Sequence, residues 1–175
     1  TWTTTDSPYI VNCDVVVNTG DTLTIEPGVE VRYNGHYSLK VQGRLLAEGT
    51  SSEPILFTRH VASDESRAQG AIRFENANAT QNVISHAIVE WGHAENITSG
   101  SHEDESGGGI YVKNSDVLIE HSTIRYNEGA VGGGIYINNP DGVPAIVRNN
   151  AIYANDAVSV FNACGGGGVA IGYGA

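Results

Sequence analysis

Short alternations of apolar and polar residues recur along the chain. Each consists of two apolar residues separated by one position, which is typical of a strand that buries one face. Successive pairs lie about 16 residues apart at first and further apart later, where insertions separate them. We interpret them as one repeated, inward-facing position: Leu23/Ile25, Leu39/Val41, Ile55/Phe57, Ile72/Phe74, Ile110/Val112, Ile135/Ile137 and Val169/Ile171.

Glycine triplets precede three of these pairs, at 107–109, 132–134 and 166–168. A sharp corner between strands needs positive φ or a close backbone approach, and glycine permits both. Because the triplet returns with the same apolar strand behind it, we expect the same corner in successive copies.

A second repeated segment accompanies the later copies. Its three versions are "HAIVEW", "STIRYN" and "NAIYAN", aligned on Ile88, Ile124 and Ile152. The alignment places Asn127 and Asn155 at one turn position and gives Trp91 the same place. A buried turn asparagine bonds the backbone and its counterpart in the next copy, so we predict a structural ladder of Asn127 and Asn155.

Internal repeats built from short strands indicate a solenoid, in which stacked coils bury the faces that one coil cannot bury alone. The first copies are too short to hold a crossover helix in each coil. We therefore predict an all-β fold, a parallel β-helix of about seven coils over residues 21–175. Residues 1–20 are expected to cap it, and 93–106 to form an inserted acidic loop. A sandwich with exposed hairpin turns is the alternative, but hairpins would not preserve the order of the repeats.

The segment 21–58 and the two "GGGIY" copies resemble right-handed parallel β-helix repeat proteins of secreted and surface type, in the pectate-lyase-like superfamily. The glycine triplets and I-x-x-N repeats are similar to those of polymorphic outer-membrane adhesins. The resemblance implies a right-handed β-helix and secretion or surface display. It transfers no catalytic motif to this chain, because the same coil hosts many functions.

The composition narrows the choice of partners. The net charge is −11, and Lys and Arg are nowhere concentrated, so nucleic acid and anionic membranes are not expected to bind. The longest apolar runs are too short for membrane insertion. The acidity also disfavours polyanionic substrates unless calcium bridges the two.

Outward-facing neighbours of the inward isoleucines form the candidate binding face. Arg73, Tyr111 and Tyr136 fall on one stripe, and Glu75 and Lys113 fall on the next. Tyrosines at coil spacing offer sugar rings a flat surface, beside groups that bond hydroxyls. We predict that these five residues bind carbohydrate, although tyrosine is also an ordinary strand residue.

No catalytic residue is assigned. A polysaccharide lyase needs a strong base and usually calcium, and Arg73 and Lys113 are the basic groups of the candidate face. No paired carboxylates of the glycosidase type stand out. We therefore favour a protein without enzymatic activity and retain polysaccharide lyase or epimerase as the enzymatic alternative.

The acidic insertion is a candidate calcium or transition-metal site. Its carboxylates are Glu95, Glu103, Asp104 and Glu105. Such a loop is also typical of a solvated excursion, and regular Asp-x-Asp spacing is missing.

Cys13 lies in the first coil and Cys164 in the last, too far apart for a bond within one straight solenoid. They are either two free thiols or partners in a disulfide between molecules.

The leading hypothesis is a non-enzymatic extracellular or cell-surface β-solenoid with a structural or adhesive role. Because a β-helix ends in unpaired backbone groups, end-to-end self-association into filaments is part of this hypothesis. The alternatives are a carbohydrate-binding module or a lyase- or epimerase-like domain.

Overall fold

The computed structural model describes residues 1–60, 72–94, 106–158 and 166–172 of the 175-residue chain. The strand pairings within these ranges are all parallel, as in Val31 beside Phe57 and Ile110 beside Ile135. Hairpin pairing is antiparallel, so the sandwich alternative is excluded and the prediction of a parallel β-helix is confirmed. The described ranges contain no helix that is both long and apolar enough to cross a membrane.

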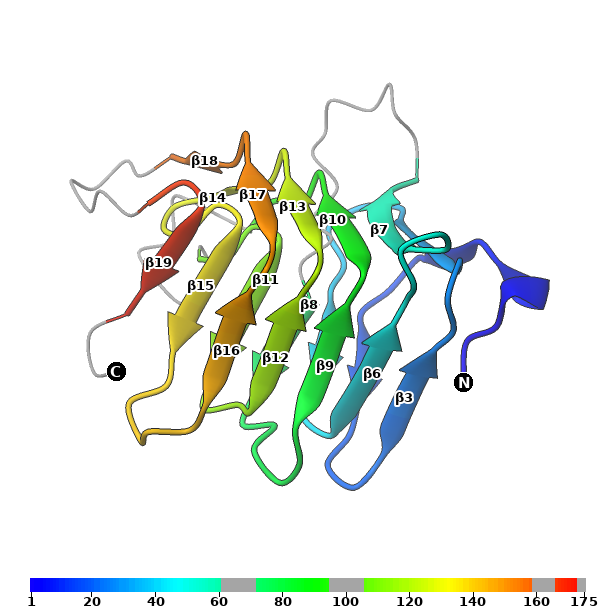
Figure 1. The fold of residues 1–175 in the computed structure, drawn as a ribbon, viewed down its shortest axis with the longest axis horizontal. Coiled ribbons are helices and arrows are strands. Elements are labelled where there is room, and N and C mark those ends of the chain that lie inside the picture. Colours follow the sequence, from blue (N-terminus) through cyan, green and yellow to red (C-terminus); the bar gives the residue numbers. More distant parts are fainter. Residues whose placement is uncertain (61–71, 95–105, 159–165, 173–175) are drawn as a thin grey trace.

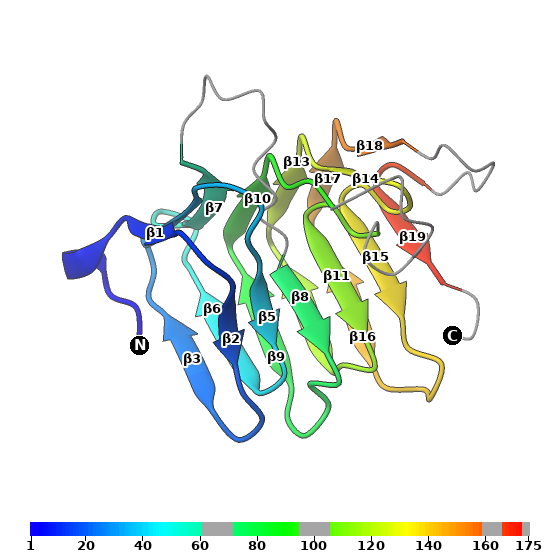
Figure 2. The same cartoon turned by 180° about the vertical axis from the view of Figure 1, so that it is seen from behind.

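Three parallel sheets form the walls of the solenoid (Figures 1 and 2). Sheet 1 contains β1 (Tyr9–Val11), β4 (Glu30–Tyr33), β7 (Ile55–Arg59), β10 (Ala87–Glu90), β13 (Thr123–Arg125) and β17 (Ala151–Tyr153). Sheet 2 contains β2 (Val15–Val17), β5 (Leu39–Val41), β8 (Ile72–Glu75), β11 (Ile110–Lys113), β15 (Ile135–Asn138) and β19 (Val169–Ile171). Sheet 3 contains β3 (Thr22–Ile25), β6 (Arg44–Glu48), β9 (Asn82–Ser85), β12 (Val117–Glu120) and β16 (Ala145–Arg148). A short fourth sheet pairs β14 (Glu128–Gly129) with β18 (Asp156–Ala157).

The core runs along the inside of the three sheets as columns of apolar side chains. In sheet 2, Ile72, Ile110 and Ile135 are aligned by strand register and are fully buried. Valines, isoleucines and aromatic residues dominate these columns because branched and flat side chains pack well on a pleated surface. Each coil thus buries its inner face mainly against its two neighbours, as a solenoid requires.

The seven apolar pairs do not form the single track that we expected. Five of them lie in sheet 2, whereas Leu23 and Ile25 belong to β3 in sheet 3, and Ile55 and Phe57 belong to β7 in sheet 1. Strands of all three sheets alternate in the same way, so the pattern identifies a strand without identifying its wall. The regular early spacing therefore does not measure the length of a coil.

The first 20 residues contribute to the walls of the solenoid. They include β1 and β2, which pair with β4 and β5. Before them lies a 3-10 turn, Thr4–Asp6, and the Trp2 amide donates a hydrogen bond to the Thr24 carbonyl at 2.8 Å.

The glycine triplets stack on one another at the corner before sheet 2. The Gly109 amide donates to the Gly133 carbonyl at 3.1 Å, and the Gly134 amide donates to the Gly167 carbonyl at 2.8 Å. A Cβ on Gly133 would collide with the Asp156 carbonyl oxygen. The second and third glycines therefore allow close backbone approach between coils, and the first glycines, Gly107 and Gly132, adopt positive φ of 70° and 62°.

Candidate functional site

The corner that follows sheet 1 carries an unusual set of exposed side chains. Trp91, Tyr126 and Ala154 occupy it in successive coils, each with a left-handed backbone at φ of 61°, 57° and 52°. A bulky residue rarely adopts positive φ, so two aromatic residues here are a feature that local backbone preference does not explain.

The strand register corrects our alignment of the second repeat. Val89, not Ile88, lies beside Ile124, and Glu90 lies beside Arg125. Trp91 is therefore the counterpart of Tyr126, and the predicted equivalence of Trp91 with Asn127 is wrong. The error is one residue, because a run of three apolar residues in "AIVEW" permits two alignments.

The aromatic rings form a column with a cation at one end. The Arg59 guanidinium carbon lies 4.0 Å from the centre of the Trp91 ring, and the Trp91 and Tyr126 rings stack at 4.8 Å. Tyr153 meets Tyr126 edge-on, with 6.3 Å between centroids. Trp91 and Tyr126 nevertheless remain 37% and 42% exposed. We call Arg59, Trp91 and Tyr126 the aromatic column.

A buried asparagine ladder fixes the backbone beside the column. Asn127 accepts a hydrogen bond from the Gly92 amide at 2.9 Å and donates to the Val89 carbonyl at 3.0 Å. Its side-chain amide also donates to the Asn155 side-chain oxygen at 2.9 Å. The structure thus brings together the two asparagines of the predicted ladder. Since Asn127 directly follows Tyr126, these bonds also position the Tyr126 ring.

The aromatic column lines a half-open pocket of about 380 Å³. Its wall is built from Arg59, Trp91, Tyr126, Glu128, Ala154 and Asp156, together with the Gly92 and Asn127 positions of the ladder. These residues come from four successive coils, so the pocket runs along the solenoid axis. One cation and two carboxylates border it.

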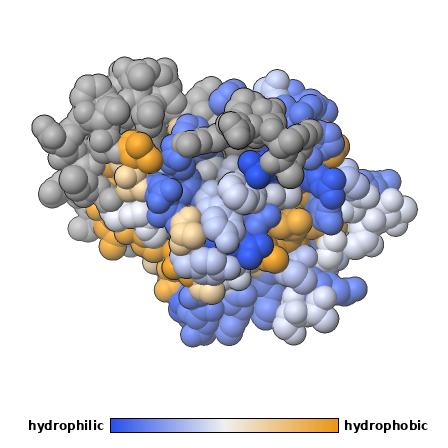
Figure 3. All heavy atoms as spheres, turned by 90° about the horizontal axis from the view of Figure 1, so that it is seen from above, coloured by the Kyte–Doolittle hydropathy of each residue, from blue (hydrophilic) through white to orange (hydrophobic). Residues whose placement is uncertain are grey.

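The two pocket carboxylates are neighbours in the fourth sheet, where Glu128 pairs with Asp156 in strand register. Glu128 is half-buried, and its Oε1 lies 3.5 Å from Nδ1 of His93, which is an ion pair when the imidazole is protonated. Asp156 is exposed. Figure 3, which looks onto the side of the solenoid that carries β14 and β18, shows a mainly hydrophilic surface broken by apolar patches. The pocket therefore combines an aromatic wall with charged groups at its rim.

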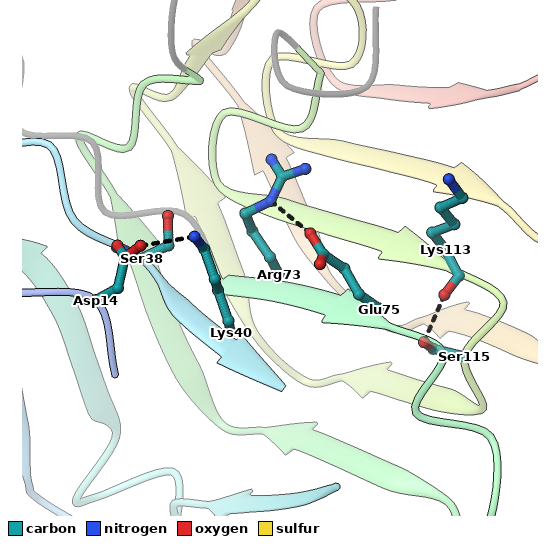
Figure 4. A network of polar contacts seen from close by, with 7 residues as sticks. All are labelled: Asp14, Ser38, Lys40, Arg73, Glu75, Lys113 and Ser115. Carbon is teal, nitrogen blue, oxygen red and sulfur yellow. Dashed lines mark hydrogen bonds and ion pairs between the residues drawn. The ribbon is translucent and has the colours of Figure 1, made fainter. Parts of the chain in front are cut away.

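The five predicted carbohydrate-binding residues come together on the outer face of sheet 2. The Arg73 Nε donates to the Glu75 carboxylate at 3.1 Å, and its guanidinium lies 4.0 Å from the centre of the Tyr111 ring. Tyr111 stacks on Tyr136 at 5.7 Å. Figure 4 shows Arg73 turned toward Glu75 and Lys113 extending from the neighbouring strand.

Burial distinguishes these five residues, the sheet 2 row, from the pocket. Tyr111 is only 1% exposed, and Arg73 is buried as well. A sugar can stack only on a ring that solvent reaches, so Tyr111 does not offer the flat surface that we expected. The row is half-exposed at Tyr136, and its role in binding sugar stays a prediction.

The remaining predicted sites fall mainly outside the described residues. The candidate metal ligands Glu95, Glu103, Asp104 and Glu105 lie there, and so does Cys164. Cys13 is exposed and has no disulfide within the described residues. No group of three or more His, Cys, Asp or Glu side chains suited to a metal ion occurs in the described part of the chain.

The pocket is not among the sites predicted from the sequence. Trp91 and Tyr126 are the best signal for it, since both are large aromatic residues directly after a sheet 1 strand. The one-residue error in alignment hid their equivalence, and the approach of Arg59 and Asp156 requires the coil stacking.

Comparison with known proteins places the fold in a family. The matching family is described as "Pectate-lyase like beta helix domain", and the match covers residues 1–133. No curated protein and no solved structure matches the chain. The matched part includes Trp91 and Tyr126 but stops before Ala154 and Asp156. With more than half of its residues matched, the chain belongs to the family of pectate-lyase-like β-helix domains.

Proposed function

We propose that this chain is a non-enzymatic, extracellular β-helical module that adheres to carbohydrate through the pocket beside the aromatic column. The observation that carries the proposal is the exposure of Trp91 and Tyr126 within a pocket of about 380 Å³. Binding pockets typically combine apolar or aromatic walls with a few placed polar groups, and this pocket has both.

The position of the aromatic column supports binding rather than stability as its role. Exposed aromatic rings at left-handed backbone positions gain less from burial than core residues do, and they carry a backbone cost. Tyr126 has a hydroxyl at its edge, so one side chain can contact a sugar ring and also bond a hydroxyl group.

The contacts of Arg73 support the non-enzymatic part. Its guanidinium packs on Tyr111 and bonds Glu75, so it is held as a structural group on sheet 2. An arginine is also permanently protonated in proteins, which makes it a poor base unless its surroundings are unusual. The extracellular part rests on the family expectation of secretion, and labelling of intact producing cells with an antibody tests it.

The first test is retention on a panel of neutral, acidic and amine-bearing polysaccharides, scored together with bond cleavage. We expect retention without cleavage, weakened about tenfold or more in Tyr126→Ala, because a ring central to a site often contributes about 2 kcal/mol. Tyr136→Ala, on sheet 2, is the control variant and should bind like the parent protein once both variants are shown to be folded.

Three outcomes contradict parts of this proposal. New chain ends in the polymer overturn the non-enzymatic part. Loss of binding in Tyr136→Ala but not in Tyr126→Ala moves the site to sheet 2. A protein that is retained on no polysaccharide overturns the carbohydrate-binding part.

A second role, end-to-end self-association, is favoured by the exposed C-terminal strand of sheet 2. Val169 and Ile171 lie in register with the buried Ile135 and Ile137. In the described residues Ile171 is nevertheless 68% exposed. Exposed apolar side chains on β19 are suited to contact another copy.

A further inference from the structure

We propose that the sugar bound at this pocket carries a protonated amine, and that the amine lies against Tyr126 and Asp156. This inference rests on the proposed carbohydrate-binding function and names the class of sugar. It uses residues on both sides of the end of the family match, because Asp156 and Ala154 follow residue 133.

The two ends of the aromatic column differ in the groups that contact them. At one end the Arg59 guanidinium carbon lies 4.0 Å from the Trp91 ring centre, which is a close cation–π contact. At the other end Tyr126 is followed in the next coil by Ala154, and both line the pocket. Tyr153 contacts Tyr126 edge-on and does not continue the stack. The pocket therefore has room at the Tyr126 end for a group that packs on the column.

The charges around this end favour a cation. Asp156 lines the pocket in the same coil as Ala154, and it has no ion-pair partner among the described residues. Glu128 lies beside it in register. The nearby Arg125 is bound to Glu90 at 2.8 Å and lies 5.5 Å from the Tyr126 centroid, so its charge is already paired.

Neutral and acidic sugars fit this arrangement less well. At the Tyr126 end a uronate would bring a carboxylate close to Glu128 and Asp156, in a chain of net charge −11, whereas Arg59, the cation of the pocket, packs on Trp91 at the other end. Like charges repel at this range, and the negative field of the whole protein adds to the repulsion. A neutral sugar can donate hydroxyl hydrogen bonds to Asp156 but brings no opposite charge. An ammonium group on the sugar would form an ion pair with the Asp156 carboxylate and a cation–π contact with the face of the Tyr126 ring.

The shape of the pocket favours an extended sugar chain over a single amine. The lining residues span four successive coils, which corresponds to roughly 14 Å along the axis. A lysine side chain would use the charge of Asp156 but has no hydroxyl group to offer Tyr126. A polymer of amino sugars can contact Asp156, the aromatic face and the polar rim together.

The test compares two glucosamine oligomers of the same length, one fully deacetylated and one fully N-acetylated, by titration calorimetry at low and at moderate salt. These probes share their hydroxyl groups and differ at nitrogen, which is a protonated amine in one and a larger, neutral acetamide in the other. We expect the deacetylated oligomer to bind about tenfold more tightly, a difference that salt reduces. In Asp156→Asn this preference should largely disappear.

Two variants separate the site from the overall charge. Asp141→Asn removes the same charge from an exposed turn outside the pocket lining, and it should keep the preference. Ala154→Tyr adds a third ring to the column. Tyr126 shows that a tyrosine can adopt positive φ at the equivalent position of the preceding coil. The new ring would fill the space proposed for the amine, so the deacetylated oligomer should bind at least about tenfold more weakly.

The results test the amine, the sugar and the carbohydrate-binding function separately. Equal binding of both oligomers, or a preference that Asp156→Asn keeps, overturns the amine while the carbohydrate-binding function stands. If a lysine oligomer binds as tightly as the deacetylated sugar and with the same dependence on Asp156, the sugar part of the inference is wrong. If no saccharide of any charge binds, the proposed function fails together with the inference.

Discussion

The Tyr33 hydroxyl lies deep in the core and has no hydrogen-bond partner among the described residues. Burial raises the pKa of this hydroxyl well above its ordinary value, because the phenolate would lose its hydration. A buried polar group without a partner costs free energy, while the ring itself packs like any core aromatic. At this position the hydroxyl therefore lowers the stability of the folded protein.

We expect Tyr33→Phe to raise the free energy of unfolding by about 1 kcal/mol, since it removes the hydroxyl and keeps the ring. Urea denaturation measures this. The matched variant is Tyr9→Phe, because the Tyr9 hydroxyl accepts a hydrogen bond from the Thr3 amide at 2.8 Å. Tyr9→Phe should lower stability by about 1 kcal/mol, and a similar loss in Tyr33→Phe would show that its hydroxyl is bonded.

Adjacent residues at one corner have separate roles. Asn127 is buried and bonds Gly92, Val89 and Asn155, whereas Tyr126 beside it is exposed and faces the pocket. The residue type alone suggested the role of Asn127, because asparagine suits repeated buried turns. The role of Tyr126 depends on what the neighbouring coils place around it.

Among the elements, the glycine triplets show how stacking decides the use of a repeated motif. A Cβ at Gly134 would lie only 2.6 Å from the Gly168 carbonyl oxygen, while a Cβ at Gly168 would meet the Ile152 Cγ2 atom at an ordinary 3.4 Å. The two glycines directly precede the paired strands β15 and β19, so they hold equivalent positions, but their surroundings differ. Their sequence context predicts the corner, and only the next coil determines how tight it is.

We therefore expect Gly134→Ala to destabilise the protein by about 3 kcal/mol or more, because the backbone of the neighbouring coil must move. Gly168→Ala should change the free energy of unfolding by less than about 1 kcal/mol. Thermal and urea unfolding of the two variants, measured side by side, check this. Similar losses in both would contradict close approach as the reason for glycine.

At the scale of the whole molecule, the two faces of each coil are not equivalent at the ends of the solenoid. Central coils are covered on both sides, and Ile110 is fully buried between Ile72 and Ile135. At the end that carries β19, Val169 and Ile171 are exposed in the described residues, and apolar surface is visible on that side of the molecule (left in Figure 3). Association between copies through β19 stays a proposal.

If the chain associates through this end, Ile171→Lys should weaken self-association about tenfold or more, since a charge would be placed in the contact. Sedimentation velocity over a range of concentrations measures it. Ile146→Lys makes the same change on β16, where the side chain points away from the core, and it should have little effect. A parent protein that stays monomeric at every concentration would overturn the self-association proposal.

The fold class and most of the inward columns can be predicted from the sequence alone. Alternation identifies a strand in any wall, and the repeats require coils that stack, so a parallel β-helix follows from pattern alone. The row of Arg73, Tyr111 and Tyr136 was also predictable, because parallel register places equivalent residues side by side. Alternation could not assign Ile55 and Phe57 to the correct wall, because every wall alternates alike.

Only the tertiary structure decided which surface is available to a ligand. Tyr111 and Tyr126 are both tyrosines beside a strand, but one is 1% exposed and the other 42%. Exposure depends on residues far away in sequence, and the pocket joins Arg59 to Asp156 across four coils. A slip of one residue at Trp91 was enough to hide the aromatic column, because the neighbouring residue of a strand or corner points elsewhere. Local sequence therefore sets the strands and turns, and the stacking of distant coils sets the site.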